Sequence, residues 1–132
     1  NIDSIAVGRL DDPELSRMTI VVAGDSATVE QVRKQLDKLV EIVKITDLTG
    51  TALVARELAL IRVKATAATR AEIVGIVNIF RGSIVDVGIN SIILEITGDE
   101  DKIDSLLNLL RPYGIREMAR AGRIAMARGS VT

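Results

Sequence analysis

Residues 91–110, SIILEITGDEDKIDSLLNLL, place a strand directly before a helix, and this pair decides the fold. The strand face consists of alternating apolar residues, namely Ile92, Leu94 and Ile96. The helix stripe recurs at helical spacing and consists of Ile103, Leu106 and Leu110. Asp99 stands at the junction, where an aspartate favours a helix N-terminus. Pro112 and Gly114 end the helix, and a further strand begins at Ile115.

The segment before this pair supplies the other elements of one arrangement. The expected elements are a strand over 57–65, a helix over 69–80 and a strand over 83–89. The turn at 88–90 joins the last of these to the strand already described. Thr69 and Glu72 have capping-box spacing, and Gly82 stands where a helix C-cap belongs. The order β-α-β-β-α-β predicts a ferredoxin-like domain, with two helices on one face of a four-stranded antiparallel sheet.

The same strand–helix pattern occurs earlier in the chain, at an offset of 74 residues. Under this offset Gly24-Asp25 falls on Gly98-Asp99. The matched apolar residues are Met18, Ile20 and Val22 in the strand and Val29, Val32 and Leu36 in the helix. Thr28 and Gln31 have capping-box spacing, and residues 42–48 (IVKITDL) predict a short strand after the helix. A structural repeat is therefore favoured over a chance match.

The first copy shows only β-β-α-β. Its first visible strand, residues 3–8, matches the third element of the second copy, so the strand and helix that open the unit have no counterpart in this sequence. By comparison with the second copy we expect roughly two dozen residues, forming a strand and a helix, to precede Asn1. The prediction is thus an α+β chain of two ferredoxin-like (βαββαβ) domains, the first lacking its first strand and helix. The predicted domains are 1–50 and 51–132, with a short linker near 48–56.

Composition removes several classes of function. The chain has 132 residues, a net charge of −1, no Cys and no His. The absence of Cys and His removes the Cys nucleophile, the commonest general base and thiolate or imidazole metal ligands. It disfavours catalysis without excluding an enzyme based on carboxylates or lysine. The net charge and the scarcity of aromatic residues, which are only Phe80 and Tyr113, argue against nucleic-acid binding. No apolar run is long enough to predict a membrane span.

Charged clusters have structural interpretations beside functional ones. Residues 11–14 (DDPE) favour a turn over a metal site. Residues 98–104 (GDEDKID) favour a helix N-terminus over a calcium loop, because the loop's glycine and final glutamate are absent. The C-terminal arginines are Arg116, Arg120, Arg123 and Arg128. They fit either a solvated edge strand, which we favour, or a surface for an anion or an acidic partner.

Asn1 is a further polar residue that is compatible with a ligand. Its amide both donates and accepts, so it suits a small zwitterion, although the residue alone fits a turn better.

The chain resembles the regulatory (small) subunits of acetolactate synthase, whose N-terminal half is an ACT domain. The resemblance rests on NIDSIAVG, SRMTIVV and the segment EQVRKQLDKLVEIVKITDL. It continues through ARELALIRVKA, IFRGSIVDVG and ARAGRIAMARG, and so covers essentially the whole chain. It implies that residues 1–50 are an N-terminally incomplete ACT domain and that 51–132 form the C-terminal domain of the small subunit.

The resemblance also implies a function without a catalytic centre. Members bind and activate the thiamine-diphosphate-dependent catalytic subunit and confer feedback inhibition by valine or another branched-chain amino acid. Thiamine diphosphate, Mg and FAD are then expected on the catalytic subunit, and no cofactor on this chain. A cytoplasmic homodimer, with no nucleic-acid or membrane partner, is expected.

The family's effector site lies between paired ACT domains. It uses the loop between the first strand and the first helix, together with the asparagine that opens the second strand. Asn1 matches that asparagine, and Ile2 follows it as in the family. The glycine-containing first loop has no counterpart in this sequence, so the effector site is incomplete in the chain as it stands.

Two alternatives remain. One is a stand-alone ACT-type amino-acid-sensing module with another partner. The other is an acylphosphatase-like hydrolase using Arg9 or Arg81, which the absence of a phosphate-binding loop disfavours.

Overall fold

The computed structural model describes residues 2–129, which divide into two compact units. Unit 1 contains the described residues up to Val54 together with those from Arg123 onward, and unit 2 is Ala55–Gly122. The predicted domains, 1–50 and 51–132, stay a prediction, because packing within one chain does not test whether either part folds alone. No helix among the described residues has the length and apolarity needed to cross a membrane.

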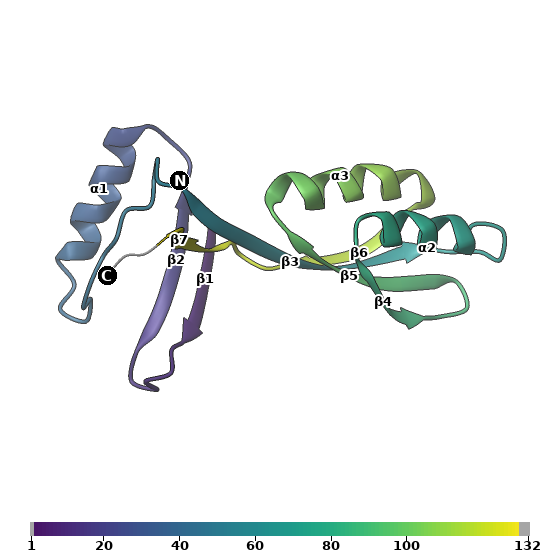
Figure 1. Ribbon diagram of the computed structural model, residues 1–132, viewed down its shortest axis with the longest axis horizontal. Coiled ribbons are helices and arrows are strands. Elements are labelled where there is room, and N and C mark those ends of the chain that lie inside the picture. Colours follow the sequence, from purple (N-terminus) through teal and green to yellow (C-terminus); the bar gives the residue numbers. More distant parts are fainter. Residues whose placement is uncertain (1, 130–132) are drawn as a thin grey trace. The chain divides into compact units, whose positions relative to one another are not determined.

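The elements follow the predicted order closely (Figure 1). Unit 1 contains β1 (Ile2–Arg9), β2 (Ser16–Val22), α1 (Ser26–Asp37) and β7 (Ile124–Ala127). Unit 2 contains α2 (Arg70–Ile79), β4 (Ser83–Val87), β5 (Ser91–Gly98), α3 (Glu100–Leu110), the 3₁₀ turn η1 (Arg111–Tyr113) and β6 (Ile115–Arg120). Strand β3 (Leu53–Lys64) begins in unit 1 and continues into unit 2. The predicted linker over 48–56 is therefore too long at its C-terminal end, since β3 starts at Leu53.

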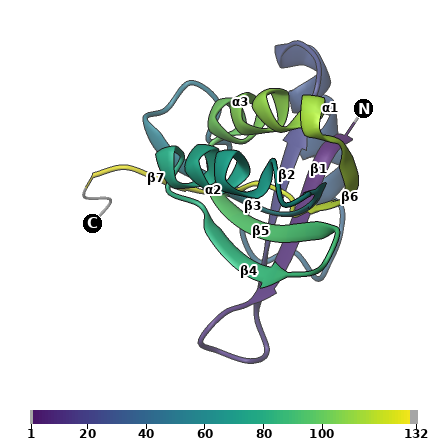
Figure 2. The same ribbon diagram turned by 90° about the vertical axis from the view of Figure 1, so that its right-hand side faces the viewer.

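Unit 2 confirms the ferredoxin-like prediction. Its strands lie in the order β4-β5-β3-β6, and each neighbouring pair is antiparallel. Helices α2 and α3 lie on the same face of this sheet (Figure 2). Along β3 the buried residues alternate with exposed ones, as a sheet with one covered face requires. Sequence periodicity thus predicted both the order and the covered face.

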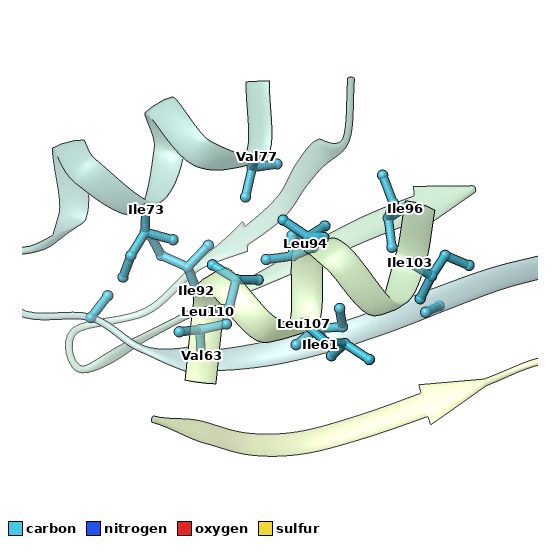
Figure 3. Packing of buried hydrophobic residues seen from close by; sticks show 13 residues of the cluster. Ile61, Val63, Ile73, Val77, Ile92, Leu94, Ile96, Ile103, Leu107 and Leu110 are labelled. Atoms are coloured by element: carbon cyan, nitrogen blue, oxygen red, sulfur yellow. The ribbon is translucent and has the colours of Figure 1, made fainter. Parts of the chain in front are cut away.

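The core of unit 2 lies between this face and the two helices (Figure 3). Its largest fully buried side chains are Ile61, Val63, Ile73, Val77, Ile92, Leu94, Ile96, Ile103, Leu106 and Leu110. Burying one such side chain contributes about 1.5–3 kcal/mol. The strand and helix stripes predicted from residues 91–110 are all members of this core.

Both predicted repeat junctions adopt the same helix cap. Asp99 Oδ1 accepts a hydrogen bond from Lys102 N at 2.8 Å, and Asp25 Oδ1 accepts one from Thr28 N at 3.0 Å. Each aspartate therefore satisfies an amide of the first helical turn. The predicted capping box of Thr28 with Gln31 is wrong, because Asp25 is the N-cap and Thr28 lies inside α1.

The predicted caps of α2 are also wrong in detail. Thr69 is the N-cap residue of α2, but its side chain makes no cap hydrogen bond. Thr69 Oγ1 accepts from Thr66 N instead, and Glu72 accepts from the Tyr113 hydroxyl. These partners lie outside the helix, so the two side chains do not form a capping box.

At the C-terminus of α2 the left-handed residue is Arg81, with φ of 59°, rather than Gly82. Arg81 N donates to Asn78 O and Gly82 N donates to Val77 O, which is the Schellman arrangement. Gly82 is required for a different reason. A Cβ there would lie 2.9 Å from Val77 Cγ1 and 3.1 Å from Glu95 O.

Unit 1 differs from unit 2 at residues 42–48. They were expected to form a strand, and the structure shows none there. The offset of 74 places residues 41–46 on β6, which pairs with β3, the first strand of its own domain. The described part of unit 1 supplies no counterpart of that first strand, so residues 42–48 have no neighbouring strand to pair with there.

Candidate functional site

The candidate site begins at Ile2, the first residue of β1. Ile2 pairs with Val22 at the end of β2, and its side chain is 54% exposed. Asn1, the other predicted effector residue, lies outside the described residues. The structure therefore locates one end of the predicted site and leaves the role of both residues a prediction.

One face of the β1–β2 hairpin is apolar, and we call it the front face. It consists of Ile2, Ile5 and Val7 on β1 with Met18, Ile20 and Val22 on β2. Ile5 lies opposite Ile20 and Val7 lies opposite Met18 in the register. Ile2 lies opposite Val22 on the same face because the register shifts between Ile2 and Ser4. Ile2, Ile5, Val7 and Met18 are exposed, so the described residues leave most of this face open.

The opposite face of the hairpin is covered. Arg123 N donates to Ser4 Oγ at 3.5 Å, and the Arg17 side chain donates from Nη2 to Ala125 O at 2.7 Å. The segment that enters β7 is thereby held on the side of Ser4 and Arg17. The front face is therefore one of the exposed apolar surfaces of unit 1, beside residues 39–43 and the exposed side chains of β7.

Helix α1 also carries partly uncovered apolar surface. Its stripe, Val29, Val32 and Leu36, is only half-buried, whereas the matched residues of α3 are fully buried. The same sequence pattern therefore produces a complete core in unit 2 and an incomplete one in the described part of unit 1.

The junction between β2 and α1 follows Val22 by three residues and is the nearest polar feature along the chain. Gly24 has φ of 140°, a conformation that side-chain-bearing residues rarely adopt. Asp25 accepts hydrogen bonds from both the amide and the hydroxyl of Thr28. These bonds lower the pKa of the Asp25 carboxyl, so it is ionised at neutral pH. The helix end is thus already occupied by a negative group of the chain itself.

The acidic segment 11–14 forms the predicted turn. Glu14 N donates to the Asp12 carboxylate, Leu15 N donates to Asp12 O, and Leu10 N donates to Leu15 O. Across residues 2–129 there is no group of three or more His, Cys, Asp or Glu side chains positioned to hold a metal ion.

The C-terminal arginines do not act as one set. Arg120 is engaged in unit 2, where it donates to Glu57 and Asp104. Arg128 Nε donates to Leu53 O in unit 1. The buried partner Glu57 was missed in the sequence. The sequence contained a sign of this burial. Glu57 is a charged residue at the position where the alternation of Ala59, Ile61 and Val63 would place another buried side chain.

The segment preceding α2 does not resemble a phosphate cradle. Residues 65–69 (ATAAT) contain no glycine. The amides of Ala65, Thr66, Thr69 and Arg70 all donate to acceptors within the chain. These donors are unavailable to an anion, which disfavours the hydrolase alternative built on Arg81.

Two known families match this chain, one in each part of the sequence. Residues 1–44 match the AHAS small subunit-like ACT domain, so the first part of the chain is of the ACT class. Residues 56–129 match the family described as the small subunit of acetolactate synthase.

Similar full-length relatives agree with both matches. A probable acetolactate synthase small subunit of Archaeoglobus fulgidus is 54% identical over 98% of this chain and 81% of the relative. The acetolactate synthase small subunit of Bacillus subtilis is 48% identical over 98% and 76%. The crystal structure of the Thermotoga maritima small subunit superposes with a TM-score of 0.89 at 46% identity, covering 99% of this chain and 82% of that one. The chain belongs to the acetolactate synthase small subunit family.

Proposed function

We propose that this chain binds and activates the catalytic subunit of acetolactate synthase and makes that enzyme sensitive to a branched-chain amino acid, with valine as the first candidate. The observation that carries the proposal is the open front face beginning at Ile2, in a domain of the ACT class. A branched aliphatic side chain gains free energy by leaving water for such a surface.

Asn1 and Ile2 are the proposed effector contacts. The Asn1 amide suits the charged amino and carboxyl groups of an amino acid, since it can both donate and accept. Ile2 would contact the aliphatic side chain. A homodimer is proposed as the binding form, because a site shared by two chains lets the ligand change how they pack. A coupling free energy of about 1–3 kcal/mol would be ordinary for such regulation.

Catalysis is assigned to the partner rather than to this chain. Thiamine diphosphate, Mg and FAD would then be held by the catalytic subunit. This division is supported by the absence of Cys and His from the sequence and by the family's designation as a small subunit.

Reconstitution tests the proposal directly. Purified catalytic subunit is assayed for acetolactate formation alone, with the full-length form of this chain that includes the first loop of the ACT domain, and with that form plus valine, leucine or isoleucine. We expect the rate to rise on adding the chain and to fall again with valine. The Ile2→Asp variant should still activate but should require more valine for inhibition. A catalytic subunit that gains neither activity nor valine sensitivity would refute the assignment, and a pull-down that recovers a different enzyme would favour the stand-alone sensor.

A further inference from the structure

Strand β1 has one edge without a neighbouring strand. It pairs with β2 along its other edge, and the two form a two-stranded sheet (Figure 1). Along the open edge the backbone N–H and C=O groups have no strand to hydrogen-bond with among the described residues. An edge of this kind can pair with a strand of another chain.

A first strand of the kind expected before Asn1 would not cover this edge. By the sequence comparison β1 matches β4 of unit 2, and β2 matches β5. In unit 2 the first strand, β3, pairs with β5 on the side away from β4, so β4 stays at the edge of its sheet. The same order in unit 1 would place a first strand beside β2. The open edge of β1 is therefore left for a partner outside its own domain.

The two matching edge strands differ in how they are protected. β4 has five residues, and its register shifts between Ile84 and Asp86, which interrupts the edge. A short length, a bulge and a charge are common ways of blocking pairing at an edge. β1 has eight residues, and its central stretch, 4–8 (SIAVG), contains no charge, no proline and no register shift. This stretch of β1 is suited to pairing, whereas β4 is not.

The charges at the two ends of this stretch favour a second copy of the chain as the partner. Asp3 precedes it and Arg9 follows it, and both are exposed. Neither side chain makes an ion pair among the described residues. When the strand is placed antiparallel to a second copy of itself, with Ala6 opposite Ala6, Asp3 of each copy lies opposite Arg9 of the other. The same register places Ile5 opposite Val7, so apolar residues of the two front faces also meet.

Other antiparallel registers lose this match. A shift by one residue places side chains of the front face opposite those of the other face, because neighbouring residues of a strand point to opposite sides. A shift by two residues places either Asp3 opposite Val7 or Arg9 opposite Ile5, so the charges no longer face each other. A twofold dimer needs a surface that is complementary to itself, and the register centred on Ala6 meets that condition.

We infer that two copies of this chain pair antiparallel along β1, held in register by an ion pair between Asp3 of each copy and Arg9 of the other. The inference specifies the interface of the proposed homodimer, and it rests on the proposed function for its effect on the effector. In this register Ile2 lies opposite Leu10 of the second copy, just beyond the end of β1. Leu10 is 45% exposed, so it can extend the apolar surface at Ile2. The second copy would thus contribute a residue to the effector site.

Charge reversal tests the register. In the full-length form of the chain, Asp3→Arg places arginine opposite arginine, and Arg9→Asp places aspartate opposite aspartate. We expect each variant to raise the dissociation constant of the dimer about tenfold or more, measured by sedimentation equilibrium at low salt. The effect should shrink at about 1 M salt, where surface charges are screened. Asp37→Arg reverses an exposed charge at the end of α1, outside the interface, and should leave the constant unchanged.

Mixing the two variants supplies the matching test. Asp3→Arg has arginine at both positions and Arg9→Asp has aspartate at both, so a dimer with one chain of each restores both ion pairs. The mixture should dimerise about as tightly as the wild type, and native mass spectrometry should show the mixed dimer in excess over either dimer of one variant. Circular dichroism verifies that both variants are folded before they are mixed.

The outcomes separate this inference from the proposed function. If the wild type is monomeric, or if the mixed dimer forms no more often than random exchange gives, pairing along β1 is overturned. If the mixture dimerises but the wild type neither activates the catalytic subunit nor makes it sensitive to valine, the proposed function fails and the pairing stands. If the wild type does both, each single variant should require more valine for inhibition and the mixture should recover wild-type sensitivity. An unchanged valine requirement would overturn the contribution of the second copy to the effector site.

Discussion

Arg120 Nε donates to Glu57 Oε1 at 2.7 Å, and Nη1 of the same guanidinium donates to Asp104 Oδ1 at 2.7 Å. One side chain thus joins β6, β3 and α3. Glu57 is only 8% exposed, so its charge depends on partners within the protein. Glu57 and Arg120 each lie two residues inside a boundary of unit 2, where the chain enters after Val54 and leaves before Arg123. The contact holds both ends of unit 2 together.

Removal of Arg120 should therefore destabilise unit 2 strongly. Arg120→Met leaves Glu57 buried with its main positive partner gone, and breaking a buried ion pair costs about 3–5 kcal/mol. Because Arg120 retains some solvent contact, we expect about 2–3 kcal/mol by urea denaturation. Arg62→Met is the control, since the Arg62–Glu117 pair is largely exposed and should contribute less than about 1 kcal/mol. Equal losses in the two variants would contradict this role.

Two glycines of unit 2 should respond to alanine in opposite directions. Gly82→Ala places a Cβ against Val77 and the Glu95 carbonyl and should destabilise by about 1–3 kcal/mol. Gly75 lies within α2 and has nothing within 4 Å of its Cβ position. Gly75→Ala should stabilise by about 0.5–1 kcal/mol, because alanine is the better helix former. Paired thermal melts measure both, and stabilisation by Gly82→Ala would contradict the close contact as the deciding factor at that position.

Tyr113 should link stability to alkaline pH. The hydrogen bond to Glu72, followed by burial, raises the pKa of the Tyr113 hydroxyl above its ordinary value of 10.0. A phenol whose pKa is raised on folding stabilises the fold fully below the unfolded pKa and loses this contribution as pH rises through the folded pKa. Phenolate absorbance should titrate at higher pH in the folded chain than in urea. In Glu72→Ala, which removes the acceptor, the difference should shrink, and an unchanged titration would exclude the hydrogen bond as its cause.

Asp25 should link stability to acid pH, and its contribution should be lost as the pH falls rather than as it rises. Hydrogen bonds from Thr28 lower its pKa below the ordinary value of 3.8. A carboxyl whose pKa is lowered on folding stabilises the fold above its unfolded pKa, and the contribution disappears as pH falls through the folded pKa. The helical circular dichroism signal of the wild type should therefore decrease in this acid range. In Asp25→Ser, which caps without ionising, that component should be absent. Identical acid profiles for the two proteins would argue against Asp25 as the titrating group.

The sequence predicted some local interactions within one segment. The Asp99 cap is an example, because its carboxylate and the amide that it accepts from are three residues apart. In α1 the local prediction was wrong, since Asp25 caps the helix in place of the expected pair Thr28 and Gln31. The alternation around Leu94 did identify the covered face of the sheet. Thr69 and Glu72 show the limit of prediction from spacing. Their side chains accept hydrogen bonds from Thr66 and Tyr113, and capping-box spacing does not reveal these partners.

The strand predicted over residues 42–48 is absent for a related reason. Their composition suits a strand, but a strand exists only beside a neighbour, and that neighbour is not among the residues described. In the candidate site, too, features within one strand were predictable and contacts between distant segments were not. Alternation placed Met18, Ile20 and Val22 on one strand face. The register that adds Ile5 and Val7 to that face needed the folded chain, and so did the Glu57–Arg120 contact, which joins residues 63 positions apart.

The position of Tyr113 beside Glu72 has an optical consequence. The chain has one tyrosine, one phenylalanine and no tryptophan, and both aromatic residues lie in unit 2. Intrinsic fluorescence therefore reports on unit 2 alone, and carboxylate contacts such as that of Glu72 commonly quench a phenol. An amino acid bound at the front face of unit 1 would be spectroscopically silent by itself. Any change in tyrosine emission on adding it would be a signal carried from one unit to the other, obtained without a label.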